Sequence, residues 1–391
     1  MLSKERIYKA ISGKTPDRVP SIPKIWVDLA ANLNNRDLME VIEDPLVALQ
    51  VIIDAAIMVG ADGARQFHFP HRKIIIKNNQ TLEIDKKGNY LGNIDMMGGL
   101  ITRLNNSSDF KLENPMQMAF HHYWTCDKEP ILKKLSEVKR ITIPIKSFYE
   151  EIGCADRQKE MIKYAGNKIC LIGDCDSATL AFYVNLRGYN NALFDLIEHP
   201  QLVHATMEKG VAIAIEKGKF NIDLGIKILR LNDSVANMSV ISPKHWREFV
   251  FPHMKDVCEE LHHYDPEVKI YCHICGNILP IVKDLVKTGL DCIGPLDPLG
   301  DFTPGQVREI VGNSISLMGG VNTLSFINYT PEQIIEEAKR CILAAGKRGG
   351  YILSSGCVIP RGANKESLKA LREAVEKYGI YHDGTLKEVE L

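Results

Sequence analysis

Apolar and polar residues alternate in a regular pattern along most of this chain. Short runs rich in Val, Ile and Leu are followed by longer segments in which apolar residues recur about every three or four positions. The short runs predict strands, and the longer segments predict helices that bury one face. The predicted strands cover residues 20–26, 63–69, 168–174, 227–233, 269–275, 290–296, 314–320 and 350–356.

Two helical segments also carry the signals that mark a helix start. Residues 330–346 open with Thr330 and Pro331 and close on Gly346, and residues 242–264 open with a Ser-Pro pair. A hydroxyl cap followed by proline is typical of a helix N-terminus, and glycine is typical of a C-terminus. The boundaries therefore support the assignment of helices between strands.

Strands that alternate with helices predict a parallel sheet whose connections cross over it in a right-handed sense. Eight such units in sequence favour an α/β fold that closes into a (β/α)8 barrel of the TIM type. A doubly wound open sheet is the weaker alternative. Because no linker or repeat interrupts the pattern, we expect one domain over residues 1–391.

The spacing of the units is uneven after the second predicted strand. Residues 71–103 contain strand-like pieces broken by Asn-Asn and Lys-Gly pairs, which predicts an antiparallel hairpin insertion. Residues 104–165 mix polar and helical stretches. We expect this second segment to cover part of the barrel.

Composition and charge exclude several classes of function. The chain carries 48 basic and 49 acidic residues, a net charge of −1, and no basic stripe that would attract nucleic acid. No run reaches the roughly 18 apolar residues that span a bilayer, and the charged N-terminus lacks a signal peptide pattern. Ten scattered cysteines suit reduced thiols, so we expect a cytoplasmic protein. The sequence is compatible with a homodimer without indicating one.

The strand at residues 269–275 places unusual side chains at its end. Successive strand residues point to opposite faces, so Tyr271, His273 and Cys275 share one face while Cys272 points the other way. The apolar neighbours of Cys272 suit the helix-facing side of a barrel. His273 and Cys275 are therefore expected to face inward at the carboxyl end, where barrel enzymes carry out their chemistry.

A third metal-binding side chain, Cys357, follows the last predicted strand. In a closed barrel its strand and that of His273 and Cys275 end at the same rim, so the three can converge on one ion. One imidazole and two thiolates neutralise Zn²⁺ and leave a fourth position open, as in catalytic zinc sites. The alternative is a buried thiol beside a core histidine.

Other polar residues follow predicted strands and are candidates for catalysis or substrate binding. Asp233 ends the fourth strand and is predicted either to position a proton or substrate or to cap a helix. For Asp176, a helix cap is favoured over catalysis, and Cys175 has no partner in the zinc set. The substrate-binding candidates are His68, His71, Asp174 and, more weakly, Asn322.

Four sequence stretches resemble the uroporphyrinogen decarboxylase superfamily, and two of these resemble its zinc-dependent methyltransferases that act with corrinoid proteins. The resemblance covers nearly the full length and implies a barrel with an N-terminal helical extension. It also implies Zn²⁺ bound by His273, Cys275 and Cys357, and an acidic residue at Asp233. The stretches are ERIYKAISGKTPDRVP, NDSVANMSVISPKHWREFVFPHMKDV, HICGN and SSGCVIP.

The resemblance to the methyltransferases implies that a methyl group moves between a small molecule and the cobalt of a corrinoid (cobalamin) held by a transient partner protein. The small molecule would be a methoxy compound, a methylamine or a thiol, and the direction of transfer is open. The decarboxylases carry an arginine cluster near the N-terminus that is missing from residues 23–32. A metal-free decarboxylase-like lyase and a non-catalytic barrel subunit remain as alternatives.

Overall fold

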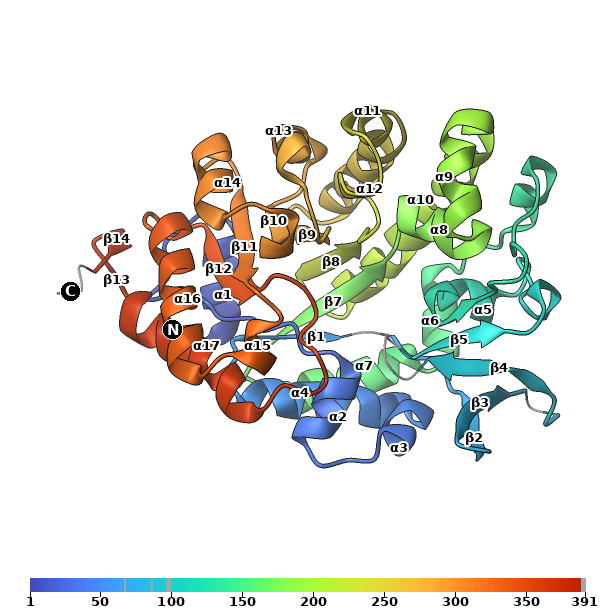
Figure 1. Ribbon diagram of the computed structural model, residues 1–391, viewed down its shortest axis with the longest axis horizontal. Helices are drawn as coiled ribbons and strands as arrows, with labels where there is room; N and C mark the ends of the chain where they lie inside the picture. The colour runs from blue at the N-terminus through green and yellow to red at the C-terminus, as the bar shows by residue number, and fades with distance from the viewer. Residues whose placement is uncertain (67, 86, 96–99, 388–391) are drawn as a thin grey trace.

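A curled parallel sheet forms the centre of the computed structural model, which describes residues 1–66, 68–85, 87–95 and 100–387 (Figure 1). Within these residues the sheet has seven strands in the order β1-β7-β8-β9-β10-β11-β12, and all neighbours are parallel. The predicted α/β class is therefore confirmed. The strands are β1 (Gly63–Gln66), β7 (Cys170–Asp176), β8 (Ile228–Asn232), β9 (Lys269–His273), β10 (Cys292–Leu296), β11 (Ser316–Val321) and β12 (Tyr351–Ser355).

The prediction of a strand at residues 20–26 was wrong. Ser21 forms only an isolated parallel bridge to Leu353, and the carbonyl of Ser21 accepts a hydrogen bond from the amide of Asp62 at 2.8 Å. The segment thus lies between β12 and the start of β1, the two edges of the sheet. Pro20 and Pro23 lack the N–H groups that a longer ladder needs.

Helices pack around the outside of the sheet, as expected for strand–helix units (Figure 1). Thr330 caps α16 by accepting from the amide of Gln333, which confirms that predicted start. Residues 242–264 are divided by a π-helical turn that precedes Pro252. The helices around the sheet are α4 (Pro45–Met58), α7 (Cys154–Ala165), α8 (Leu180–Arg187), α9 (Tyr189–Glu198), α10 (Pro200–Asp223), α11 (Pro243–His245), α12 (Phe251–Tyr264), α13 (Val282–Leu285), α14 (Pro304–Val311), α15 (Ser325–Asn328), α16 (Pro331–Ala345) and α17 (Lys365–Tyr378).

The core has an inner and an outer part. The larger cluster packs the outward faces of the strands against the helices and includes Ile270 and Cys272. The inner cluster lies inside the curl, where α1 (Ser3–Ile11) closes the amino end of the strands. Its members are Ile7, Ala10, Ile11, Ile22, Cys170, Ile172, Ile228, Tyr271, Cys292, Met318 and Ile352.

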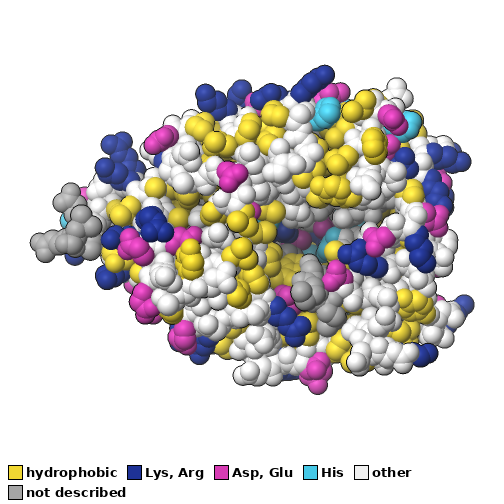
Figure 2. Space-filling model, in the orientation of Figure 1, with side chains coloured by type: hydrophobic (Ala, Val, Ile, Leu, Met, Phe, Trp, Pro, Cys, Tyr) yellow, Lys and Arg dark blue, Asp and Glu magenta, His cyan; other side chains and the backbone are white. Residues whose placement is uncertain are grey.

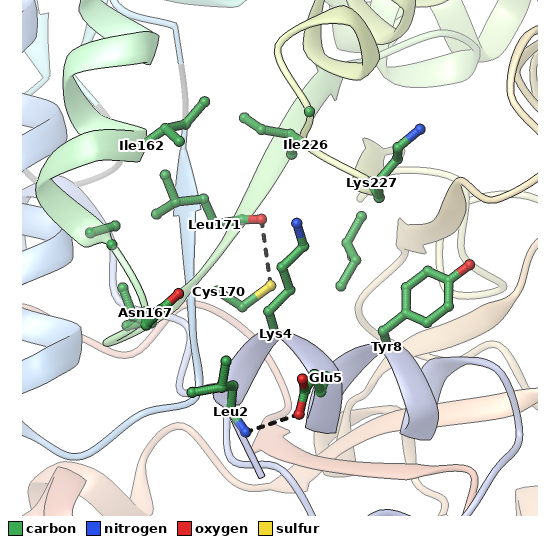
Figure 3. A pocket seen from close by; sticks show the side chains of 15 residues that line it. Leu2, Lys4, Glu5, Tyr8, Ile162, Asn167, Cys170, Leu171, Ile226 and Lys227 are labelled. Carbon is green, nitrogen blue, oxygen red and sulfur yellow. Dashed lines mark hydrogen bonds between the residues drawn. The ribbon is translucent and has the colours of Figure 1, made fainter.

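A small cavity of about 210 Å³ lies beside α1 at this closed end. Figure 3 shows Lys4 and Tyr8 of α1 beside Cys170 of β7 and Lys227, which precedes β8. The residues that line it come from α1, from the end of α7 and from the amino ends of β7 and β8. It is therefore separate from the predicted site residues, which follow the carboxyl ends.

The segment after β1 forms a second, smaller sheet. An antiparallel hairpin joins β2 (Lys73–Lys77) to β3 (Gln80–Ile84), and Asn78 and Asn79 at its turn have φ of 51° and 59°. The sheet continues with β4 (Tyr90–Asp95), β5 (Ile101–Leu104) and β6 (Trp124–Thr125). Residues 86 and 96–99 of the predicted insertion, and residue 67 of the predicted second strand, lie outside the described residues.

The remaining elements are short. In the described part of the chain, no helix combines the length and the apolar character needed to cross a membrane. The short elements are α2 (Val27–Leu33), α3 (Leu38–Glu43), α5 (Pro115–Ala119), α6 (Lys146–Glu151), the 3-10 turns η1 (Ser107–Asp109), η2 (His121–Tyr123), η3 (Leu135–Arg140), η5 (Leu279–Ile281), η6 (Val286–Thr288) and η7 (Pro298–Gly300), the π-helical turn η4 (Trp246–Val250), and the strand pair β13 (Tyr381–His382) and β14 (Thr385–Leu386).

Buried ion pairs hold α1 and the start of the chain against the sheet. Asp62 is fully buried, and its carboxylate accepts from Arg6 and from Arg18, both at 2.8 Å. Asp62 also accepts from the amide of Ser21 at 2.8 Å. One carboxylate therefore joins α1, the segment that bridges the sheet edges and the start of β1.

Replacing Asp62 with Ala should lower the free energy of unfolding by about 3–5 kcal/mol, because two buried guanidinium groups lose their counter-ion. Denaturant unfolding followed by circular dichroism measures this loss. A loss below about 1 kcal/mol, the range of an exposed pair, would contradict the role of Asp62.

Asp17→Asn is the matched control for Asp62→Ala. The carboxylate of Asp17 is half-exposed and forms an ion pair with Arg6 but not with Arg18.

Burial raises the pKa of Asp17, but Arg6 outweighs burial and lowers that pKa to about 2. The stabilisation is present above the ordinary carboxyl pKa and fades as the pH falls through about 2. The wild type should therefore lose more stability than Asp17→Asn on acidification.

Candidate active site

The end of β9 determines which side chains can reach the open end of the sheet. Tyr271 lies in the inner cluster, whereas Ile270, Cys272 and Ile274 lie in the outer one. The alternation predicted for this strand is therefore confirmed, including the exclusion of Cys272. His273 continues the inner face at the last position of the strand.

The three predicted ligand side chains come together at this end. One ligand atom from each of His273, Cys275 and Cys357 lies within 4.8 Å of the others, and Sγ of Cys357 lies 3.7 Å from Nε2 of His273. Cys357 reaches the group from the turn that follows β12. One imidazole nitrogen and two sulfurs in a partly buried pocket match the ligand types that Zn²⁺ prefers.

Asp297, which follows β10, connects the two turns that carry the cysteines. Its Oδ2 accepts from the amide of Gly276 at 3.0 Å, and its Oδ1 accepts from the amide of Leu299 at 3.1 Å. Gly276 has φ of 79°, a conformation that favours glycine. At Gly356 a Cβ would approach Pro298 Cδ to 2.6 Å. Close packing around Asp297 thus fixes the backbone on both sides of the site.

The electrostatics of the ligand group favour one thiolate. A hydrogen bond from Cys275 lowers the pKa of Cys357 to about 6, despite the opposing effect of burial, while the same contact raises the pKa of Cys275. The pair therefore loses its first proton easily and its second with difficulty in the absence of a cation. Burial, reinforced by Lys24, Arg230 and Arg65, holds the pKa of His273 well below its usual range. A neutral imidazole is the form that binds metals.

A cavity of about 440 Å³ opens beside the ligand group. Figure 2 shows a hollow near the middle of this face, with a histidine side chain inside it and charged side chains around it. Its wall combines apolar side chains with a larger number of polar and charged ones, which can orient a bound molecule. It is lined by Trp26, Ile101, His122, Asp174, Asp176, Ser177, Ala181, Val184, Asn185, Arg230, Asn232, Ser234, Val235, His273, Cys275, Cys357 and Val358.

Two buried ion pairs form the polar part of this wall. Arg230 donates to Asp174 at 2.5 Å and to Asn232 at 2.6 Å. Lys217, which is almost fully buried on α10, donates to Asp176 at 2.9 Å. Asp174 therefore lines the cavity as predicted for a substrate-binding residue, with one oxygen already used by Arg230.

Asp233 lies at the first turn of α8. Its carboxylate accepts from the amide of Ala181 at 2.7 Å and from the hydroxyl of Thr179, and burial raises its pKa to about 6. These contacts match the predicted capping alternative. Asp233 is not among the described residues that line the cavity. Its catalytic role stays a prediction.

The other predicted substrate-binding residues, His68, His71 and Asn322, are not among the described residues that line the cavity. His68 is buried, and the centroid of its ring lies 5.4 Å from the ring centroid of Phe220. Burial lowers the pKa of His68 to about 3. Asn322 accepts from the amide of Leu324 at 2.9 Å in a turn, and His71 lies 3.5 Å from Arg157. Their substrate-binding roles stay predictions without support from the geometry.

Sequence reasoning missed a second cluster beside the same cavity. The ligand atoms of His121, His122 and Asp176 lie within 4.8 Å of one another, and Lys217 contacts the same carboxylate. For Asp176 the sequence favours a helix cap over catalysis, and the two histidines fall in residues 104–165, the segment that is predicted to cover part of the barrel. Lys217 could have been identified from the sequence, because it is a lysine on an otherwise apolar face of a predicted helix.

Comparison with known proteins places this geometry in context. Residues 126–378 match the model of the family described as uroporphyrinogen decarboxylase. In fold, a methyltransferase from Methanosarcina mazei aligns with a TM-score of 0.67 at 15% identity, over 96% of this chain and 98% of that chain. The predicted resemblance is therefore confirmed.

Sequence relatives include enzymes of two kinds. The methylated-thiol–coenzyme M methyltransferase of M. mazei is 28% identical over 46% of this chain and 46% of its own length. A uroporphyrinogen decarboxylase of Thermosynechococcus vestitus is 27% identical over 45% and 49%, and the methylcobamide:CoM methyltransferase MtaA of Methanosarcina barkeri is 24% identical over 46% and 51%. The chain thus spans about half the length of these relatives.

Asp297→Ala should weaken metal binding about 10–100-fold, because the turn that carries Cys275 loses its anchor. Titration with Co²⁺, followed through the thiolate-to-cobalt absorption, measures the affinity. Asp256→Ala, on the exposed face of α12, should leave the affinity unchanged. Equal Co²⁺ affinities in the wild type, Asp297→Ala and Asp256→Ala would show that Asp297 does not organise the site.

Proposed function

The chain belongs to the uroporphyrinogen decarboxylase family, and we propose that it is a zinc-dependent methyltransferase that exchanges a methyl group with the cobalt of a corrinoid protein. The observation that carries this proposal is the convergence of His273, Cys275 and Cys357 beside an open cavity. A decarboxylation that needs no metal gives no reason for two thiols and an imidazole to meet there.

We propose that Zn²⁺ binds to Nε2 of His273 and to the sulfurs of Cys275 and Cys357. When bound, zinc would supply Lewis acidity to a sulfur, oxygen or nitrogen atom of the substrate. The thiols must stay reduced for this purpose, and each of the ten cysteines is free in the structure. A cytoplasmic location is therefore part of the proposal.

The chain's own residues would bind and orient the small molecule. Trp26, Ile101 and Val358 supply apolar surface, while Asp174 and Arg230 supply fixed polar groups on the same wall. Since Arg230 and Asp174 already form a close pair, their orientation does not have to change when substrate binds. Preorganised polar groups of this kind position a substrate at low entropic cost.

The substrate class in this proposal is a methoxy compound, a methylamine or a thiol. The methyltransferases among the relatives carry names that refer to coenzyme M and to a methylated thiol, which supports a thiol as one member of the class. The same ligand group can also assist a methyl donor by withdrawing electrons from the departing atom. The proposal therefore covers both directions of transfer.

A corrinoid protein is the proposed partner, docked transiently over the cavity. Its cobalt must come close to the substrate, and the cavity opens on the face shown in Figure 2. Ile101 at the start of β5 contributes to the cavity wall, so the small sheet would help to shape the docking surface.

A metal-free lyase is the second candidate, because decarboxylases are among the relatives. Elemental analysis of protein purified without added metal separates the two functions. The methyltransferase proposal predicts about one zinc ion per chain. Absence of zinc, together with failure to bind added zinc, would favour the lyase.

Methyl transfer provides the direct test. The wild-type protein, mixed with a methylated corrinoid protein and β-mercaptoethanol, should produce the cob(I)alamin spectrum, and Cys357→Ala should abolish this change and the bound zinc. Cys126→Ala, a buried cysteine outside the ligand group, should retain both. The unfolding midpoint of Cys357→Ala distinguishes the roles: an unchanged midpoint indicates a catalytic ion, whereas global unfolding would indicate a structural one.

A further inference from the structure

We propose that His122 is a catalytic residue that carries the substrate's proton during methyl transfer, a role that rests on the proposed function. His122 belongs to η2, in the segment that connects β5 to β6 of the small sheet. Its side chain is 21% exposed and lines the same cavity as the ligand group. The imidazole therefore faces the space in which a substrate would be bound.

Asp176 fixes the orientation of this ring. Nδ1 of His122 lies 2.7 Å from Oδ2 of Asp176. This is an ion-pair contact without hydrogen-bond geometry, and the nearby negative charge favours the tautomer with the proton on Nδ1 and a lone pair on Nε2. Among the described residues, Nε2 has no hydrogen-bond partner. The nitrogen that remains available is thus the one that can accept a proton from a ligand.

Asp176 itself is held in an unusual backbone conformation. It ends β7 with φ of 70°, a region in which a residue other than glycine is strained. Its Oδ1 accepts from the amide of Ser177 at 3.0 Å, and its Oδ2 accepts from Lys217 at 2.9 Å. Strain that is maintained by a buried ion pair is characteristic of functional sites.

Lys217 also decides against a metal ion in this cluster. Its ammonium group lies at the carboxylate oxygen that His121 and His122 face, and it donates to the carbonyl of Ala119 at 3.0 Å. A metal ion there would meet a buried cation. Burial raises the pKa of Asp176, but His122, Lys217 and His121 outweigh burial and hold that pKa well below its usual range. The carboxylate therefore stays charged and orients the ring.

Elimination leaves His122 as the group that can transfer a proton. Among the described residues that line the cavity, Asp174 is paired with Arg230, and Asp176 with Lys217. The other titratable side chains there, apart from His122, are the proposed metal ligands. A hydrogen bond alone would require only a polar side chain, whereas an aspartate-held imidazole is suited to proton transfer.

The reaction requires such a group in either direction. With a thiol as acceptor, the S–H bond breaks and an N–H bond forms at Nε2 of His122. The sulfur then forms a bond to the methyl carbon, and the carbon–cobalt bond breaks with its electron pair remaining on cobalt. In the reverse direction, the imidazolium returns the proton to the sulfur, oxygen or nitrogen that loses its methyl group.

The activity test compares His122→Gln with wild type in the assay with methylated corrinoid protein and β-mercaptoethanol. We expect kcat to fall about 100-fold or more, with zinc content unchanged. Imidazole should partly restore the activity of His122→Ala.

A second measurement does not depend on activity. In metal-free protein labelled with ¹⁵N-histidine, the His122 signals, assigned by their loss in His122→Gln, should show a protonated Nδ1 and an unprotonated Nε2 in the neutral ring. The opposite tautomer would contradict the proposal.

His263→Gln, on the exposed surface of α12, is the matched control for the activity test and should leave kcat unchanged.

The possible results separate this proposal from the function on which it rests. If wild type is active and His122→Gln retains kcat within about threefold, the role of His122 is wrong and the methyltransferase stands. Loss of zinc in His122→Gln would also overturn the role, because the residue would then support the metal site. Inactive wild type with zinc bound would overturn both.

Discussion

The curl of the parallel sheet is the constraint on which the candidate site depends. His273 and Cys357 are separated by 84 positions in the chain, and only the curl of the sheet brings the ends of β9 and β12 to the same opening. Between them, Asp297 at the end of β10 holds the turn at Gly276. The strands therefore bring the two segments close enough for Sγ of Cys357 to lie 3.7 Å from Nε2 of His273.

Buried charge determines the chemistry of the interior. Lys24 is almost fully buried, and burial, reinforced by Arg65, holds its pKa well below the usual range, while the thiols of Cys357 and Cys275 act in the opposite direction. Cations beside thiols favour the thiolate form. On the other wall, Lys217 keeps Asp176 charged, and this carboxylate orients His122. The cavity thus has a wall that would hold a metal and a wall that would exchange a proton.

Sequence patterns were sufficient to predict seven of the strands and the convergence of His273, Cys275 and Cys357. Strand alternation decides which side chains face inward, and parallel strands bring their carboxyl ends to one edge of the sheet. The strand at residues 20–26 failed because its prolines limit the ladder to one bridge at Ser21. The cluster around His122 was missed because it depends on how a long insertion folds back onto the sheet. Lys217, Asp176 and His122 lie on three separate elements, and no single sequence period connects them.

An X-ray absorption spectrum at the zinc edge tests the central claim most directly. With protein purified without added metal, the account predicts a zinc ion with two sulfur neighbours at about 2.3 Å and two nitrogen or oxygen neighbours at about 2.0–2.2 Å. The spectrum should lose one sulfur neighbour in Cys275→Ala. A zinc ion coordinated only by nitrogen and oxygen in the wild type would contradict the account.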